Sequence, residues 1–272
     1  MKKLIITTLL VALAAFPASA KSVLDFQTGT ATYTDILVKQ KNFEKLVTDI
    51  GMMTSYRAVA PSEPLKGTLS FGFDIGVEAS LSKIDKNKDY WKDAVKPEPY
   101  SILSNSPISS SQYFTKVHAQ LGLPVIPLEF GLVYGTSQDI DNLKFAGAEI
   151  KYAILEGTAA TPALAIRGSY TAISGIDILD IKTYQADISI SKGILMVTPY
   201  AGVGQVWIKG KAKDTVNPAV PGDAAVTLQD VSVSETKGFV GAKISFLPVM
   251  NLVLEGEFAT VNTYSVRLNV GF

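Results

Sequence analysis

A set of polar side chains that could do chemistry alternates with apolar residues along this chain. These residues are Asp74, Glu78, Lys116, His118, Glu129, Glu149, Lys151, Arg167, Asp187, Lys243, Glu255, Glu257 and Arg267. Carboxylates interleaved with lysines and arginines can pair with one another, or they can line a narrow polar path for ions or small solutes. The acidic members outnumber the basic ones, which would give such a path a weak preference for cations.

Catalysis would require a different arrangement. The sequence contains no glycine loop for phosphate, no nucleophile elbow and no zinc-ligand cluster, and it has no cysteine. His118 is the one histidine, and a histidine base without a positioned nucleophile is not a catalyst. We therefore expect no enzyme, no metal and no cofactor. The alternative is a lipid- or peptide-modifying barrel enzyme that uses His118.

Strict alternation indicates the elements that position these side chains. From Leu69 to Leu81 every second residue is apolar, and the intervening residues are serine, glycine and carboxylates. Period-two alternation places the two sets on opposite faces of a β-strand. An unbroken apolar face of this length is typical of a tilted strand that crosses a bilayer.

The same pattern recurs to the end of the chain. Candidate strands lie around residues 113–121, 128–135, 146–154, 164–171, 184–190, 195–208, 240–246, 252–258 and 264–272. Short turns join some of them, and longer segments, notably 84–112 and 209–231, join the others. An even number of strands, joined alternately by short turns and longer loops, predicts a closed antiparallel transmembrane β-barrel of about ten strands over residues 66–272.

Composition agrees with a membrane barrel and excludes other classes. Apolar residues make up 47% of the chain and charged residues only 18%, and the mean hydropathy is +0.23. Basic and acidic residues are balanced at 25 each, so electrostatic attraction to nucleic acid is not expected. Closure satisfies the backbone polar groups that an open sheet edge would leave unpaired in hydrocarbon.

Residues 1–20 are predicted to be a secretory signal peptide. Lys2 and Lys3 precede a short apolar run, which ends before the small residues Ala18-Ser19-Ala20. This order of a basic region, an apolar region and a cleavage site directs export. We expect the mature chain to begin at Lys21.

Residues 21–65 are expected to form a short helical segment at the periplasmic mouth or inside the lumen. Phe43, Leu46, Val47 and Ile50 fall at helical spacing. The alternative is an extra pair of strands, including residues 52–58, which would raise the strand count to twelve. The polar run 39–45 disfavours a lipid-facing strand and favours the helix.

The C-terminal strand carries a family resemblance. Tyr264, Val266, Leu268, Val270 and Phe272 are apolar at alternate positions and end in a terminal phenylalanine. In this the chain resembles the bacterial outer-membrane β-barrel proteins of Gram-negative cells. The resemblance implies export through the periplasm, insertion by the barrel assembly machinery and contact with outer-membrane lipids.

The expected function is passive. A small barrel has a narrow interior, so its charged residues are predicted to pair and close the lumen, or else to leave a narrow channel for ions or small solutes. A structural or surface-interaction role follows from the first arrangement, and a porin-like role from the second. Aromatic residues near predicted strand ends, including Tyr134, Trp207 and Phe258, suit interfacial girdles.

Overall fold

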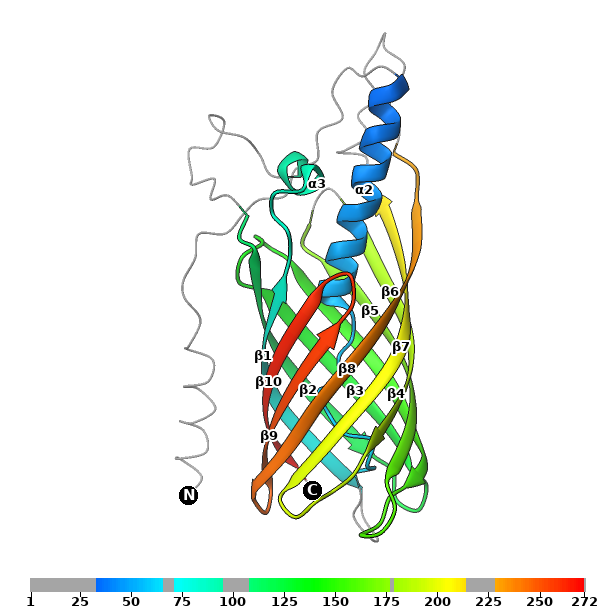
Figure 1. Cartoon of the computed structure of the whole chain (residues 1–272), viewed down its shortest axis with the longest axis vertical. Coiled ribbons are helices and arrows are strands. Elements are labelled where there is room, and N and C mark those ends of the chain that lie inside the picture. The colour runs from blue at the N-terminus through cyan, green and yellow to red at the C-terminus, as the bar shows by residue number, and fades with distance from the viewer. Residues whose placement is uncertain (1–32, 66–70, 95–107, 177–178, 214–227, 272) are drawn as a thin grey trace.

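The computed structural model describes residues 33–65, 71–94, 108–176, 179–213 and 228–271. The predicted signal peptide and Phe272 lie outside these residues. The described elements are α2 (Tyr33–Thr54), β1 (Gly72–Lys83), α3 (Asp89–Asp93), β2 (Ser111–Gly122), β3 (Leu128–Ser137), β4 (Lys144–Glu156), β5 (Ala163–Ser174), β6 (Leu179–Ser191), β7 (Val197–Ala212), β8 (Val231–Leu247), β9 (Met250–Phe258) and β10 (Asn262–Gly271). The ten strands pair in sequence order, and β1 pairs with β10 to close an antiparallel barrel (Figure 1). This confirms the predicted fold class.

The two ends of the barrel differ in their connections. Short turns join β2 to β3, β4 to β5, β6 to β7 and β8 to β9 at the lower end in Figure 1, where β1 begins and β10 ends. The other connections lie at the upper end. We call the two parts of the barrel the short-turn half and the long-loop half. The closing seam is formed by β1 and β10. The first residue of β1 and the last residue of β10 therefore both lie at the short-turn rim.

Helix α2 enters the long-loop half of the barrel (Figure 1). Phe43, Leu46 and Ile50 lie on one face at helical spacing and are fully buried. The helix packs against β7, where glycines permit close approach. A Cβ atom on Gly210 would lie 2.4 Å from Val47 of the helix, and one on Gly51 would lie 2.5 Å from Ile208 of the strand. Side chains at either glycine would push the helix off the barrel wall.

The alternative of extra strands between residues 52 and 58 is wrong. The helix continues to Thr54, and the chain then runs without regular structure to residue 65. Arg57 contributes to this ending, because its guanidinium donates to the carbonyl oxygens of Met52 at 2.5 Å and Met53 at 2.9 Å. A cation that bonds the last helical carbonyls stabilises a helix C-terminus.

The polarity of the barrel wall inverts along its axis, as β6 illustrates. Near the long-loop end its inward residues Leu179 and Ile181 are buried and apolar, whereas its outward residue Lys182 is exposed. Toward the short-turn end the inward residues are Thr183, Gln185, Asp187 and Ser189, and the outward residues are Tyr184, Ala186, Ile188 and Ile190. The long-loop half thus resembles a water-soluble barrel with an apolar core, and the short-turn half has the opposite polarity.

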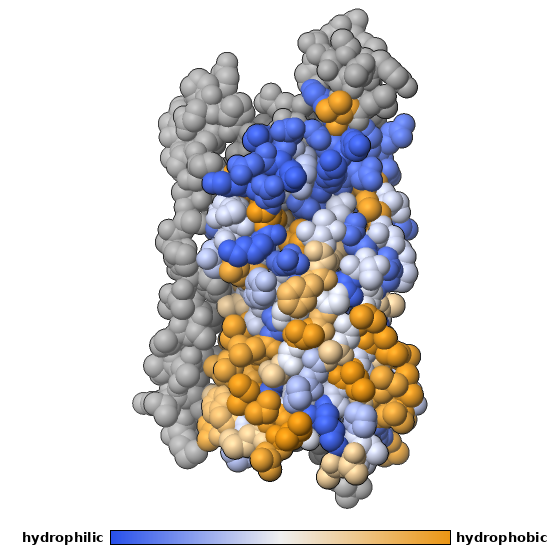
Figure 2. Space-filling model, in the orientation of Figure 1, coloured by the Kyte–Doolittle hydropathy of each residue, from blue (hydrophilic) through white to orange (hydrophobic). Residues whose placement is uncertain are grey.

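The exterior follows the same division. In Figure 2 the apolar side chains gather on the lower part of the visible face, and hydrophilic side chains cover its upper part. Exposed aromatic residues on the outer face include Tyr134, Tyr170, Tyr184, Trp207, Phe258 and Tyr264. In the short-turn half, exposed Ile75, Leu132 and Val203 extend the apolar surface. No helix among the described residues is both long and apolar enough to cross a membrane.

Candidate functional site

Residues 55–65, which we call the lumen segment, descend through the inside of the barrel. Near the long-loop half, Arg57 contacts β9 and β10 through Glu257 and Thr263. At the short-turn rim, the backbone N–H of Ser62 donates to Ser191 Oγ at 3.1 Å, and that of Leu65 donates to Glu129 Oε1 at 2.6 Å. The barrel wall therefore supplies hydrogen-bond partners along the length of a segment that has no secondary structure of its own.

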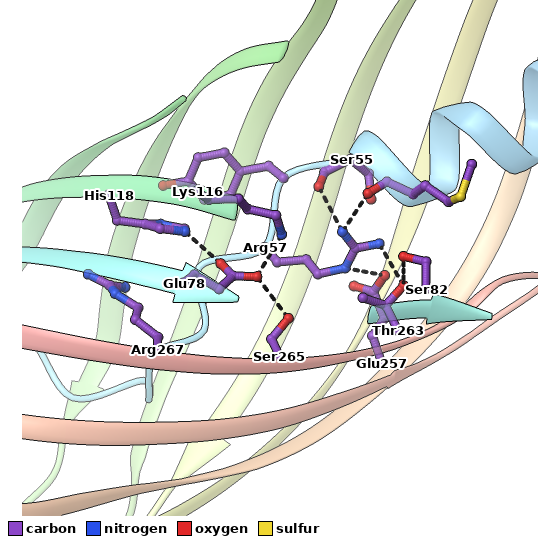
Figure 3. Close-up of polar contacts among 12 residues, drawn as sticks. Ser55, Arg57, Glu78, Ser82, Lys116, His118, Glu257, Thr263, Ser265 and Arg267 are labelled. Atoms are coloured by element: carbon purple, nitrogen blue, oxygen red, sulfur yellow. Dashed lines mark hydrogen bonds and ion pairs between the residues drawn. The ribbon is translucent and has the colours of Figure 1, made fainter. Parts of the chain in front are cut away.

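The upper polar cluster holds the lumen segment to the wall (Figure 3). Arg57 Nε lies 3.0 Å from Glu257 Oε1, and Lys237 Nζ lies 2.6 Å from Glu257 Oε2. Lys237 also donates to the carbonyl oxygen of Tyr56 at 3.4 Å. All three charged side chains are almost fully buried. One carboxylate thus pairs with two cations, one from the segment and one from β8.

Glu78 of β1 is the centre of a second cluster (Figure 3). Its Oε1 accepts from Lys116 Nζ at 2.6 Å and from Ser265 Oγ at 2.8 Å. Its Oε2 lies 2.6 Å from His118 Nε2. The β-register brings these residues together, since Glu78 is directly opposite Lys116 on β2. The alternation in the sequence predicts that Glu78, Lys116 and His118 face the lumen, and the pairing of β1 with β2 brings them within hydrogen-bonding distance.

His118 is hydrogen-bonded to a carboxylate, and its ring bonds no hydroxyl group within the described residues. A base must be hydrogen-bonded to its nucleophile, but the hydroxyl of Ser265 donates to Glu78 instead. His118 Nδ1 has no hydrogen-bond partner among the described residues, and the side chain is fully buried. A substrate could not reach this ring without displacement of the lumen segment or the barrel wall.

Further ion pairs fill the short-turn half. Arg267 bonds Asp74, and its Nη1 donates to the carbonyl oxygen of Ala58 at 2.6 Å. Arg167 Nε lies 3.1 Å from Glu149, and its Nη1 lies 3.5 Å from Asp187. Other contacts are Lys151 with Glu129 at 2.9 Å, Lys243 with Glu63 at 3.9 Å, and Tyr200 with Glu255 at 2.8 Å. Such pairing offsets the desolvation of charges in a narrow interior.

The structure places every residue of the sequence-derived set on the inner face. Twelve of these thirteen residues are buried, and Lys243 is half-buried. Sequence reasoning missed Arg57 and Lys237, which both pair with Glu257. Lys237 has the same parity as Lys243 on β8, so extending that strand toward its N-terminus would have found it. Of the predicted assembly signal, Tyr264, Val266, Leu268 and Val270 lie on the outer face of β10, and Phe272 lies outside the described residues.

A polar cavity lies at the short-turn end of the lumen. It has a volume of about 290 Å³ and is lined by residues of the lumen segment together with Asp74, Lys243, Asn251 and Asn269. The lumen segment forms one wall of this cavity and continues upward to the Arg57 cluster. The cavity is therefore a vestibule bounded by the segment, and the buried ion pairs of Glu78 and Glu257 lie above it.

A buried carboxylate joins two helices in the long-loop half. Asp49 of α2 accepts from Trp91 Nε1 at 2.8 Å and from the Tyr90 hydroxyl at 2.9 Å, both on α3. Burial raises the pKa of Asp49 above its ordinary value, and these two hydrogen bonds partly oppose the increase. Burial and the neighbouring Asp49 charge raise the pKa of Tyr90. Helix α3 is thus joined to α2 by a carboxylate that is costly to ionise.

Comparisons with known proteins identify no family. Within the described residues, no three His, Cys, Asp or Glu side chains are grouped so that they could hold a metal ion. No family model matches the chain, and no curated protein matches it either. The class is therefore defined by the structure: a closed ten-stranded antiparallel barrel whose interior is apolar in the long-loop half and ion-paired in the short-turn half.

Several solved barrels are similar to this chain. Neisserial surface protein A is 11% identical, with 75% of this chain and 99% of that chain covered and a TM-score of 0.30. The N-terminal β-barrel domain of Pseudomonas aeruginosa OprF is 10% identical, with 73% and 97% covered and a TM-score of 0.32. The KdgM porin is 8% identical, with 73% and 99% covered and a TM-score of 0.35. Similarity at this level assigns this chain no function.

Proposed function

We propose that this protein is an integral outer-membrane barrel that is closed by its own lumen segment and presents its long-loop half outside the membrane. The inverted polarity of the wall carries this proposal. Only the short-turn half combines an apolar exterior with a polar interior, so only that half is suited to lipid. The long-loop half, with an apolar core around α2 and a hydrophilic exterior, is suited to water.

The contents of the lumen favour a structural or surface-interaction barrel over an open channel. A conducting path needs polar groups that an ion can approach and leave. Here the ion pairs of Glu78 and Glu257 are buried, and the lumen segment runs between them and the opposite wall. A passing ion would have to displace these contacts. We assign no catalytic role to His118, because within the described residues its Nε2 is bonded to Glu78 and its Nδ1 is bonded to no nucleophile.

The partners of such a barrel follow from its surfaces. Outer-membrane lipids contact the apolar exterior, and the barrel assembly machinery inserts the chain by recognising the outer face of β10 and Phe272. Solutes or ions would reach the vestibule beside Lys243 but would not cross the barrel. The long-loop half is the part available to other molecules at the cell surface.

Cysteine labelling on intact cells tests the location and orientation. Since the chain has no cysteine, a single Lys86→Cys variant reports on the long-loop end, and Ala159→Cys reports on the turn between β4 and β5. A membrane-impermeant maleimide should label Lys86→Cys on intact cells and should label Ala159→Cys only after lysis. The reverse pattern would refute the orientation. A steady current through the purified protein in a planar bilayer would refute the closed lumen.

A further inference from the structure

An aromatic row marks the upper border of the apolar surface on β5, β6 and β7. Tyr170 is directly opposite Tyr184, and Tyr184 is directly opposite Trp207. The rings of Tyr170 and Tyr184 have centroids 5.2 Å apart. All three side chains are exposed on the outer face. Tyrosine and tryptophan are enriched where hydrocarbon meets the polar headgroups of a bilayer.

Two lysines stand immediately above this row. Lys182 and Lys209 are directly opposite each other across the β6–β7 ladder, one outward position beyond Tyr184 and Trp207. Both are exposed, and Lys209 Nζ lies 5.6 Å from the centroid of the Tyr184 ring. Like charges at directly opposite positions are destabilising. Neither lysine forms a hydrogen bond or ion pair within the described part of the chain, so the repulsion is uncompensated there.

The described charges around these two lysines are mostly basic. Lys211 is the next outward residue of β7, and its cross-strand partner Asp180 is already engaged with Lys213 at 3.3 Å. Asp230, which is exposed just before β8, is the other acidic residue that the β7–β8 register places beside this group among the described residues. Within the part of the chain that the structure describes, four lysines therefore face two carboxylates at the border of the apolar surface.

We propose that Lys182 and Lys209 bind the phosphate group of an anionic lipid in the membrane leaflet on the long-loop side. This inference rests on the proposed function, because it requires the aromatic row to lie at a bilayer surface. Lysine stems can lie along apolar surface while the ammonium groups reach the headgroup layer. One phosphate between the two ammonium groups would remove their repulsion and supply the missing acceptors. Basic groups beside a bilayer attract anionic lipids in this way.

Trp207 provides the reporter for the test. It lies beside the two lysines, whereas Trp91 is fully buried in the long-loop core, and a Trp207→Phe variant gives the Trp91 background. The protein is reconstituted in phosphatidylcholine bilayers that contain a small fraction of brominated phosphatidylglycerol or brominated phosphatidylcholine. We expect the anionic lipid to quench Trp207 about fivefold more effectively than the neutral lipid at low salt, with the difference declining as salt is added.

A matched pair of double variants separates this site from general surface charge. Lys182→Gln with Lys209→Gln should abolish the preference for the anionic lipid. Lys83→Gln with Lys144→Gln removes the same charge from exposed outward lysines on β1 and β4 and should preserve the preference. Equal loss in both double variants, or no preference in the unmodified protein, would overturn the lipid site. Relief of quenching by soluble glycerol phosphate would show a site for free phosphate and would also overturn it.

The two proposals fail in different ways. If neither brominated lipid quenches Trp207, the aromatic row is not at a bilayer surface, and the proposed membrane placement fails. If both lipids quench it equally, the membrane placement stands and the anionic lipid site is refuted.

Discussion

Replacement of Arg57 by glutamine should release the lumen segment from the barrel wall. The guanidinium pairs with Glu257, bonds Thr263 Oγ1 at 3.2 Å, and bonds the last carbonyls of α2. Breaking a buried ion pair costs about 3–5 kcal/mol. Glu257 keeps Lys237 at 2.6 Å, so we expect the lower end, about 3 kcal/mol. At 1.4 kcal/mol for each tenfold change, the equilibrium constant for displacement of the segment should rise about a hundredfold.

Hydrogen exchange measures this displacement directly. The backbone amides of Ser62 and Leu65 donate to side chains of the wall, so they exchange when the segment leaves it. Mass spectrometry of peptides from the lumen segment should show about a hundredfold loss of protection in Arg57→Gln. Lys92→Gln, which removes an exposed charge from α3, serves as the control and should leave protection unchanged. Protection within about threefold of the unmodified protein would refute the anchoring role of Arg57.

Three further changes test the two faces of the wall and the long-loop core. Glu78→Gln keeps the side-chain shape but removes the charge that balances Lys116, so the free energy of unfolding should fall by about 1–3 kcal/mol. Urea titrations followed by gel mobility measure this loss, and an unchanged free energy of unfolding would contradict the ion-pair network. Ile75→Lys places a charge on the apolar exterior and should cost about 2–4 kcal/mol in the same assay, whereas Ile75→Val should be silent. Because burial raises the pKa of Asp49 above 3.8, the folded state holds that proton more tightly, and stability of the long-loop half should fall as pH rises through the window above that value. Asp49→Asn should remove this dependence of stability on pH. Unfolding of the long-loop half is followed by Trp91 fluorescence in a protein that also carries Trp207→Phe. An unchanged pH dependence in Asp49→Asn would assign it to another titrating group.

The barrel could be predicted because its short-turn half obeys a simple pattern. Because each strand faces lipid on the outside and ion pairs on the inside, apolar and polar residues must alternate along it. The run from Leu69 to Leu81 shows this alternation almost without interruption. The observed strand β1, Gly72–Lys83, is shifted by a few residues from this run, but its residues face the lumen and the exterior as the alternation predicts. Alternation also assigned the inward charges, since parity alone decides which face a residue occupies.

The long-loop core and the lumen segment were not predictable in this way. Phe114 is buried on the same inner face as Lys116, and period two cannot distinguish an apolar residue that faces lipid from one that faces a helix. One of the two cationic partners of Glu257, Arg57, lies 200 residues away in the chain. That pairing depends on a segment without periodicity, so no local pattern indicates it. Only closure of the barrel around the segment brings the two side chains together.

The path of the lumen segment also constrains how the barrel is assembled. Helix α2 lies in the long-loop half, whereas β1, which follows the segment in the chain, begins at the short-turn rim and forms the closing seam with β10. In a barrel that had already closed, the bulky helix side chains, such as Phe43, would have to pass the crowded ion pairs of the lower lumen. Helix α2 and the lumen segment must therefore lie inside the forming barrel before β1 and β10 pair. Seam closure is then the last of these steps, in which the wall forms around a segment of its own chain.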